Sequence, residues 1–153
     1  MIRKRRLRLA DIDILRGLEW RPEDIKESEA AGTGGVFPGI RKALEDGHDA
    51  WIVKAVDTGD ILVVMGHKGQ PDGTALVWAV ATTKAIRYKQ PLVKMAIKFV
   101  RGIRAKFKYG YNAVWAGNWL HVMFLRRLGA TFCPPVAVNG HMFLAFRIGE
   151  NYV

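Results

Sequence analysis

Residues 111–132 constrain the fold more than any other part of the chain. A short apolar run at residues 113–116 ends in a Gly-Asn pair, and an amphipathic helical pattern then continues to just before Gly129. Asn118, at this junction, can cap the new helix, and Gly129 suits the left-handed residue that often follows a helix. The segment therefore predicts a strand that passes directly into a helix.

Length and composition indicate one folded unit. With 153 residues, the chain is long enough to bury roughly two thirds of its unfolded surface. No repeat, low-complexity tract or linker interrupts it, so residues 1–153 are expected to form a single domain. Cys133 is the only cysteine, which excludes an internal disulfide, and it is expected to be a small core residue. No apolar run approaches the ~20 residues that span a bilayer, so no membrane partner is expected.

The net charge of +10 is concentrated in the C-terminal half. Residues 1–72 hold 12 basic and 13 acidic side chains, whereas residues 73–149 hold 12 basic side chains and no Asp or Glu. One side of the molecule should therefore attract phosphates, nucleic acid or acidic protein surfaces. The basic N-terminus is read as a first strand containing Leu7 and Leu9, with a nucleic-acid-binding arm as the alternative.

The N-terminal half predicts a strand, two helices and three antiparallel strands. After the first strand, a turn or short helix follows that Asp11 can cap. Helical patterns cover residues 21–32 and 39–47, and both end in glycine. Strand-like runs separated by strong turn signals cover residues 50–56, 60–69 and 74–83, and they predict an antiparallel meander.

The C-terminal half predicts a long helix, the strand and helix of residues 111–132, and a closing strand or hairpin. The long helix runs from Gln90 to about Lys108. Its apolar stripe consists of Leu92, Val93, Ala96, Ile97, Val100, Ile103 and Phe107. Asn139-Gly140 predicts a tight turn within residues 136–148. A strand–helix–strand crossover over residues 74–120 requires two parallel strands, so this order predicts an α+β sandwich with a mixed sheet.

This order resembles the acyl-CoA N-acyltransferase (GNAT) superfamily, and within it the small GNAT-like internal virion proteins of short-tailed, podovirus-type bacteriophages. The resemblance rests on four short blocks and one aromatic residue. They are Pro22 with Glu29-Ala30-Ala31-Gly32, Phe37-Pro38, Val114-Trp115-Ala116-Gly117-Asn118, and Phe124-Leu125 with Leu128-Gly129-Ala130 before Phe132. It implies a GNAT-like α/β/α sandwich whose mostly antiparallel, mixed sheet splays between its fourth and fifth strands. It also implies a protein made during phage assembly and associated with the particle.

The resemblance further implies where acetyl-CoA would bind if the chain binds it. Pantetheine would pair with the backbone of the fourth strand at Val80, Ala81 and Thr82. The pyrophosphate would lie on a glycine-rich turn that opens the next helix, where free N–H groups point at the anion. This chain has no glycine between Ala75 and Arg101, and Pro91 removes one donor. The remaining cofactor-binding candidates are Arg87, Lys89, Gln90 and Asn118.

Acyl-transfer catalysis has still less support. The resemblance implies a Tyr seven residues after Asn118, where this chain has Leu125. The fourth and fifth strands contain no carboxylate that could act as a base. The remaining candidates for proton transfer are His67, expected to be exposed, His121, expected to pack or cap, Tyr109 and Tyr111. The histidines and Cys133 lack metal-ligand spacing, so neither a metal site nor a catalytic residue is assigned.

Cationic side chains on the outer side of the long helix are the candidate partner-binding surface. They are Lys94, Lys98, Arg101, Arg104 and Lys108. A solvated exterior would also explain them, but surfaces usually mix both signs of charge. Expected partners are acidic surfaces of portal or tail components in an oligomeric assembly, or the genome. Trp78, Trp115 and Trp119 are expected to fill the cleft between the splayed strands.

Three functions follow from these observations. The first is a virion- or assembly-associated structural protein whose acetyltransferase chemistry is lost or vestigial, located in the virion and, during assembly, in the host cytoplasm. It requires no cofactor. The second is an acetyl-CoA-dependent N-acyltransferase with a nonstandard phosphate site. The third is a basic nucleic-acid-binding module.

Overall fold

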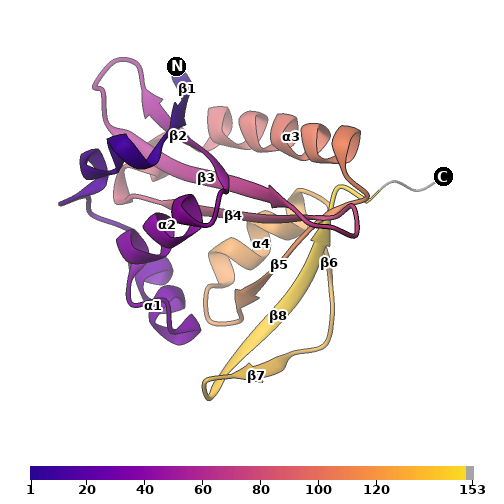
Figure 1. Cartoon of the computed structure of the whole chain (residues 1–153). Helices are drawn as coiled ribbons and strands as arrows, with labels where there is room; N and C mark the ends of the chain where they lie inside the picture. The colour runs from indigo at the N-terminus through magenta and orange to yellow at the C-terminus, as the bar shows by residue number, and fades with distance from the viewer. Residues whose placement is uncertain (151–153) are drawn as a thin grey trace.

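One mixed sheet runs through the molecule, and a computed structural model describes residues 1–150 of it (Figure 1). Within that range the strands follow the order β1-β2-β3-β4-β5-β8-β6, and β7 pairs with β8. The strands are β1 (Ile2–Leu7), β2 (Asp49–Ala55), β3 (Ile61–Gly69), β4 (Ala75–Ala81), β5 (Gly110–Trp115), β6 (Thr131–Phe132), β7 (Val136–Val138) and β8 (His141–Ile148). The α-helices are α1 (Pro22–Ala31), α2 (Val36–Glu45), α3 (Lys89–Lys106) and α4 (Trp119–Arg127), and 3-10 helices η1 and η2 cover Leu9–Leu15 and Thr83–Tyr88.

The expected splay lies between β4 and β5. These strands are parallel and pair only near their starts, where Ala75 lies opposite Gly110 and Leu76 opposite Tyr111. All other strand pairs in the sheet are antiparallel. Beyond the paired residues, the Asn112 side chain reaches across and donates a hydrogen bond to the carbonyl oxygen of Val77, 2.7 Å away. The α+β sandwich with a mixed, mostly antiparallel sheet is therefore confirmed.

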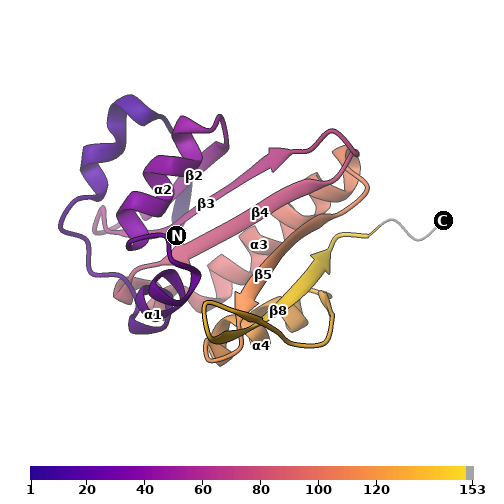
Figure 2. The same ribbon diagram turned by 60° about the horizontal axis from the view of Figure 1, so that its bottom comes forward.

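Helices cover both faces of the sheet, with α1 and α2 on one side and α3 and α4 on the other (Figure 2). The first core joins η1 and α2 to β1, β2 and β3, with Ile52 and Val64 fully buried at its centre. The second core packs α3 and α4 on β4, β5 and β8 around Val114. This arrangement follows from periodicity, because each helix presents one apolar stripe to the sheet.

Local signals place most element ends correctly. Pro22 lies at the start of α1, and Gly32 ends that helix with φ 75°, a conformation that glycine adopts without steric cost. Asn139 (φ 50°) and Gly140 (φ 77°) form the predicted turn between β7 and β8. The second helix begins at Val36, three residues earlier than expected. Asp11 lies inside η1 and does not cap it, because the helix begins at Leu9 with Arg8 at its N-cap position.

Burial corrects two predictions about single residues. Cys133 is exposed rather than part of the core, because it directly follows β6 at the edge of the sheet. His67 was expected in an exposed turn, but it lies in β3 with a side chain that is only 16% exposed. Its ring stacks on Trp51 at 5.4 Å, and Phe99 and Phe107 of the α3 segment lie edge-on to it. The tertiary packing of α3 on β3 therefore decides its environment.

Candidate functional site

The segment that leads into α1 closes the outer edge of β4 at its C-terminal end. The N–H of Arg21 donates to the carbonyl oxygen of Ala81 at 3.0 Å, and the N–H of Thr83 donates to the carbonyl oxygen of Glu19 at 2.9 Å. Trp20 and Thr82 form an isolated antiparallel bridge between these two bonds. Residues 19–21 therefore occupy the side of β4 that the splay leaves without a neighbouring strand.

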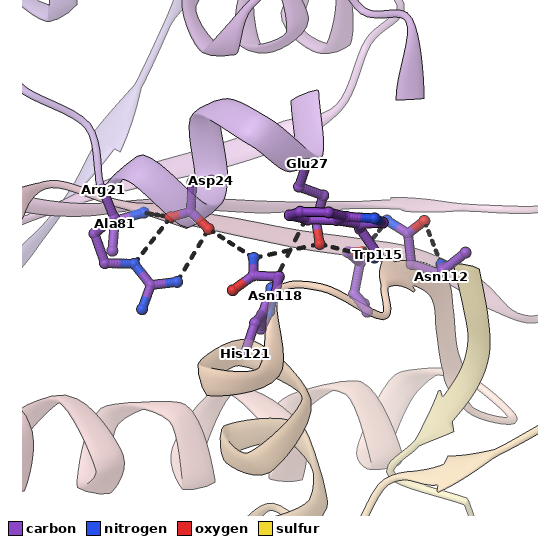
Figure 3. Close-up of polar contacts among 10 residues, drawn as sticks. Arg21, Asp24, Glu27, Ala81, Asn112, Trp115, Asn118 and His121 are labelled. Carbon is purple, nitrogen blue, oxygen red and sulfur yellow. Dashed lines mark hydrogen bonds and ion pairs between the residues drawn. The ribbon is translucent and has the colours of Figure 1, made fainter. Parts of the chain in front are cut away.

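Asp24 of α1 fixes the helix to β4. Its carboxylate accepts the backbone N–H of Ala81 at 2.8 Å and pairs with the guanidinium of Arg21 (Figure 3). It also accepts a hydrogen bond from the Asn118 amide at 3.1 Å. The Asp24 side chain is only 2% exposed, so the Arg21 charge and three sources of hydrogen bonds compensate for the loss of its hydration.

Glu27, one turn further along α1, fixes the helix to β5. Its Oε1 accepts the backbone N–H of Trp115 at 2.9 Å and the Asn118 amide at 3.3 Å. Burial raises the pKa of Glu27 to about 7, because the charged form loses hydration, and the nearby Asp24 carboxylate raises it further. The hydrogen bond from Trp115 acts in the opposite direction. Glu27 can therefore gain or lose a proton near neutral pH.

Asn118 and His121 complete the group from the other side of the splay. Asn118 is fully buried at the turn between β5 and α4, and its backbone carbonyl accepts the N–H of Val122. The sequence predicted that its side chain caps α4, but no side-chain hydrogen bond caps this helix start, and the amide nitrogen donates to the two α1 carboxylates. His121 Nδ1 lies 3.9 Å from Glu27 Oε2, and burial lowers the pKa of this imidazole. Within residues 1–150, neither Asn118 Oδ1 nor His121 Nδ1 has a hydrogen-bond partner.

This buried group, which we call the α1 clasp (Arg21, Asp24, Glu27, Asn118 and His121), joins the separated ends of β4 and β5. Asp24, Glu27 and His121 each place a possible metal-ligand atom within 4.8 Å of the others. Both oxygens of Asp24, however, already accept hydrogen bonds, and the Arg21 cation lies beside them. The possible ligand atoms of the α1 clasp therefore fit a hydrogen-bonded cluster better than a cation site.

The predicted cofactor-binding residues lie on both sides of the splay. Val80, Ala81 and Thr82 form the end of β4 and the residue after it, and Thr82 is held by hydrogen bonds to the carbonyl oxygens of Ile61 and Leu62. Arg87 is exposed in η2, and Lys89 and Gln90 are exposed at the start of α3. Asn118 lies across the splay, within the α1 clasp. Binding of CoA by these residues stays a prediction.

The three tryptophans do not form the expected plug. Trp78 points to the α2 side of the sheet, where its Nε1 donates to His48 Nδ1 at 3.0 Å. Trp115 packs edge-on against His141 at the start of β8. Trp119 is 57% exposed at the start of α4. Polar groups of α1, rather than indole rings, therefore bridge the splay.

The predicted partner-binding cations lie together on the α3 segment. Lys94, Lys98, Arg101 and Arg104 are exposed on α3, and Lys108 is exposed just after its end. In the part of the chain that the structure describes, no ion pair involves Lys94, Lys98 or Arg101. Among the described residues, these three cations are therefore not neutralised by an ion-paired carboxylate.

Tyr109 and Tyr111 lie away from the clasp, near the paired ends of β4 and β5. They line a hollow of about 410 Å³ together with Asp72, Cys133 and Arg147. The guanidinium of Arg147 lies 4.5 Å from the centroid of the Tyr109 ring. These tyrosines therefore do not lie beside His121. The proton-transfer candidates that were predicted from the sequence are divided between two separate places in the fold.

Arg21, Asp24 and Glu27 were not predicted as site residues. The carboxylates of the site come from α1 and not from the fourth and fifth strands, where an acyltransferase base was expected. The available signal was the spacing of Asp24 and Glu27, which places both on one face of a helix, opposite exposed Lys26. That spacing could not show which element the face meets.

Comparison with protein families and curated proteins gives one family. A family model described as "Bacteriophage T7, probable scaffold protein Gp13" matches residues 52–135, which is more than half of the chain. Comparison with curated proteins finds no match. The matched residues include β3, β4, α3, β5 and α4, and so both strands of the splay.

Several solved structures share the fold. The smu.2055 protein of Streptococcus mutans superposes with a TM-score of 0.68 at 14% identity, covering 95% of this chain and 96% of that one. The aminoglycoside N(6')-acetyltransferase of Legionella pneumophila gives a TM-score of 0.68 at 13% identity, covering 96% and 90%. The spermidine N-acetyltransferase of Vibrio cholerae, solved with CoA and spermine, gives a TM-score of 0.66 at 12% identity, covering 96% and 93%. At these identities the likeness establishes a GNAT fold.

Proposed function

The chain belongs to the family of the bacteriophage T7 probable scaffold protein Gp13, and on this basis we propose that it is a structural protein of phage assembly whose acyl-transfer chemistry is lost. Its GNAT fold then presents binding surfaces to other proteins of the particle. None of the helices in residues 1–150 combines the length and apolar character needed to cross a bilayer. The proposed location is the virion, and the host cytoplasm during assembly.

The proposed loss of chemistry rests on the backbone of Ala81, whose N–H and carbonyl groups are both already hydrogen-bonded to α1 and to the segment that leads into it. The GNAT resemblance places pantetheine on the backbone of β4, with hydrogen bonds to this edge. The N–H of Ala81 donates to Asp24, and its carbonyl oxygen accepts the N–H of Arg21. A pantetheine arm at this peptide would have to displace a buried carboxylate that also holds a guanidinium and an amide, which is costly.

The phosphate and leaving-group positions support the same proposal. The start of α3 has no glycine, and Pro91 in its first turn has no N–H to offer an anion. Leu125, at the position where the resemblance implies a Tyr, is buried in the second core. A leucine cannot protonate a thiolate, so acyl transfer would need another acid.

Two measurements test the proposal. Acetyl-CoA at millimolar concentration should leave the melting temperature unchanged, whereas a ligand at 100 times its Kd would stabilise the fold by roughly 2.7 kcal/mol. Mass spectrometry of purified phage particles should detect the chain in every preparation. A clear thermal shift would contradict the loss of the CoA site, and absence from particles would contradict the structural role.

Glu27 favours the second candidate function, an acetyl-CoA-dependent N-acyltransferase. A carboxyl group with a pKa of about 7 beside a neutral imidazole is suited to accept a proton from an amine near neutral pH. In this case Glu27→Gln would abolish transfer of radiolabelled acetyl groups to an amine, whereas Glu29→Gln, an exposed change on the same helix, would retain it. Absence of turnover by the wild-type chain would remove this candidate.

The cationic α3 segment favours the third candidate function, nucleic-acid binding. Lys98 and Arg101, which are exposed, would contact phosphates, so duplex DNA should be retained in a salt-dependent manner. Lys98→Glu combined with Arg101→Glu would then abolish retention. Retention that survives this double change would contradict a site on α3.

A further inference from the structure

The outward face of α4 carries apolar side chains that a free surface does not need. Val122 and Leu125 point into the second core, whereas Trp119 and Met123, one turn apart, are each 57% exposed. Leu120 beside them is 38% exposed. Arg126 and Arg127 continue the exposed side one turn later. We call Trp119, Leu120, Met123, Arg126 and Arg127 the α4 face.

The composition of the α4 face is typical of a protein–protein contact. Trp, Met and Arg are enriched at such contacts, and buried Trp and Arg side chains often contribute most of the binding energy. Trp119 is held at a helix start whose preceding residue, Asn118, is fully buried and bonded to α1. The indole is therefore presented from a rigid position, which lowers the entropy lost when a partner covers it.

Charge decides which partner fits. Residues 73–149 contain no Asp or Glu, and α3, with exposed Lys94, Lys98 and Arg101, lies on the same side of the sheet as α4 (Figure 2). Two like copies facing each other through this side would bring like charges together. Nucleic acid would satisfy the cations but would leave Leu120 and Met123 without an apolar partner. The surface fits a protein with an apolar centre and an acidic rim.

We propose that the α4 face is the docking site for an acidic protein surface of the phage particle, with α3 steering the approach. This inference rests on the proposed function in phage assembly, and it adds which surface makes the contact. Trp119 and Met123 enter the apolar centre of the partner surface. The cations of α3 and Arg127 face its carboxylates and increase the association rate, an effect that salt weakens.

Particles assembled in cells that supply the chain in trans test this proposal. The phage carries a deletion of the corresponding gene, and the cells express wild type, Trp119→Ser combined with Met123→Ser, or Val56→Ser. Val56 is the matched control, because it is 53% exposed and lies after β2, outside the α4 face. The melting temperature of each purified chain is measured first to show that it folds.

We expect the Trp119/Met123 double variant to show at least about a tenfold loss in copies per purified particle, whereas Val56→Ser matches wild type. Lys98→Glu combined with Arg101→Glu should also lower incorporation. Equal incorporation of the Trp119/Met123 double variant and wild type would overturn the inference while leaving the structural role intact. Absence of wild type from particles would overturn both.

Two further measurements test the other possible occupants of the α4 face, which are a second copy of the chain and nucleic acid. Light scattering of the purified chain reports on a second copy. A dimeric wild type together with a monomeric Trp119/Met123 double variant would overturn the acidic-partner proposal. Particles emptied of DNA report on nucleic acid: loss of the wild-type chain together with the genome would also overturn it. Retention in emptied particles, with a monomeric chain in solution, is the expected result.

Discussion

The Asp24 carboxylate lies 2.8 Å from the backbone nitrogen of Ala81 and accepts its hydrogen bond. This contact joins a helix near the N-terminus to the end of β4, 57 residues further along the chain. Together with the bond from Trp115 to Glu27, it makes α1 a brace between two strands that no longer pair with each other. The splay of the sheet is therefore held by side chains of α1.

Removing the Asp24 carboxylate should destabilise the fold strongly. Asp24→Ala leaves the Ala81 N–H, the Arg21 guanidinium and the Asn118 amide without their shared acceptor. We expect a loss of roughly 3 kcal/mol in the free energy of unfolding, measured by chemical denaturation. Glu29→Ala, an exposed change on the same helix, should change stability by no more than about 0.5 kcal/mol. Equal effects of the two changes would contradict the bracing role of Asp24.

Glu27 should make stability depend on pH. Its pKa is 4.5 when exposed in the unfolded chain and about 7 in the fold, because burial disfavours the carboxylate. The folded state therefore holds the proton more tightly. The contribution of Glu27 to stability is fully present below pH 4.5 and is lost as pH rises through 7, by roughly 3 kcal/mol in total.

Glu27→Gln removes this titration but keeps an oxygen that can accept the N–H of Trp115. We expect the variant to be more stable than wild type at pH 8, and the difference to shrink to roughly 1 kcal/mol or less at pH 5. Thermal melts of both chains across this range measure it. A greater advantage for the variant at pH 5 than at pH 8 would refute the assignment.

Gly117 should not tolerate a side chain. A Cβ at this position would lie 2.3 Å from the nearest carbon of the Trp115 indole, so Gly117→Ala must displace the ring beside the α1 clasp. We expect a loss of about 1–3 kcal/mol in the free energy of unfolding. Gly102→Ala in α3 is the matched control, because a Cβ there meets nothing within 4 Å. That change should stabilise the helix by up to about 1 kcal/mol.

Cys133 should react readily in the native protein. Its thiol is exposed and lines the hollow near Tyr109, so a disulfide reagent can reach it without unfolding. We expect one equivalent of a chromogenic disulfide to react with the folded chain at a rate similar to that in denaturant. Cys133→Ser should show no reaction. Protection of the native thiol would contradict this exposure and would favour the core position that the sequence predicted.

Much of the fold could be predicted because its signals are local. The turn at Asn139 and Gly140, the stop at Gly32 and the apolar stripe of α3 each depend on residues within a few positions of one another. The strand, asparagine and helix around residue 118 were also placed correctly. Such patterns report which residues face a core, and the order of elements then limits the sheet to few topologies.

The α1 clasp could not be predicted in the same way. Its key bonds join residues 57 and 94 positions apart, and they exist only because α1 crosses the open end of the splay at a particular angle. The same packing decides that Asn118 binds carboxylates rather than capping α4, and that Trp119 faces solvent rather than the cleft.

The sequence by itself determined the order of most helices and strands, several turn positions and the concentration of positive charge in residues 73–149, since these depend on local backbone preference and composition. Only the tertiary structure decided what fills the gap between β4 and β5 and which apolar side chains of α4 are exposed. The physical reason is that hydrogen bonds and burial between distant segments depend on the relative placement of whole elements. A buried carboxylate such as Asp24 is recognised only when its partners, Ala81 and Arg21, have been brought to it.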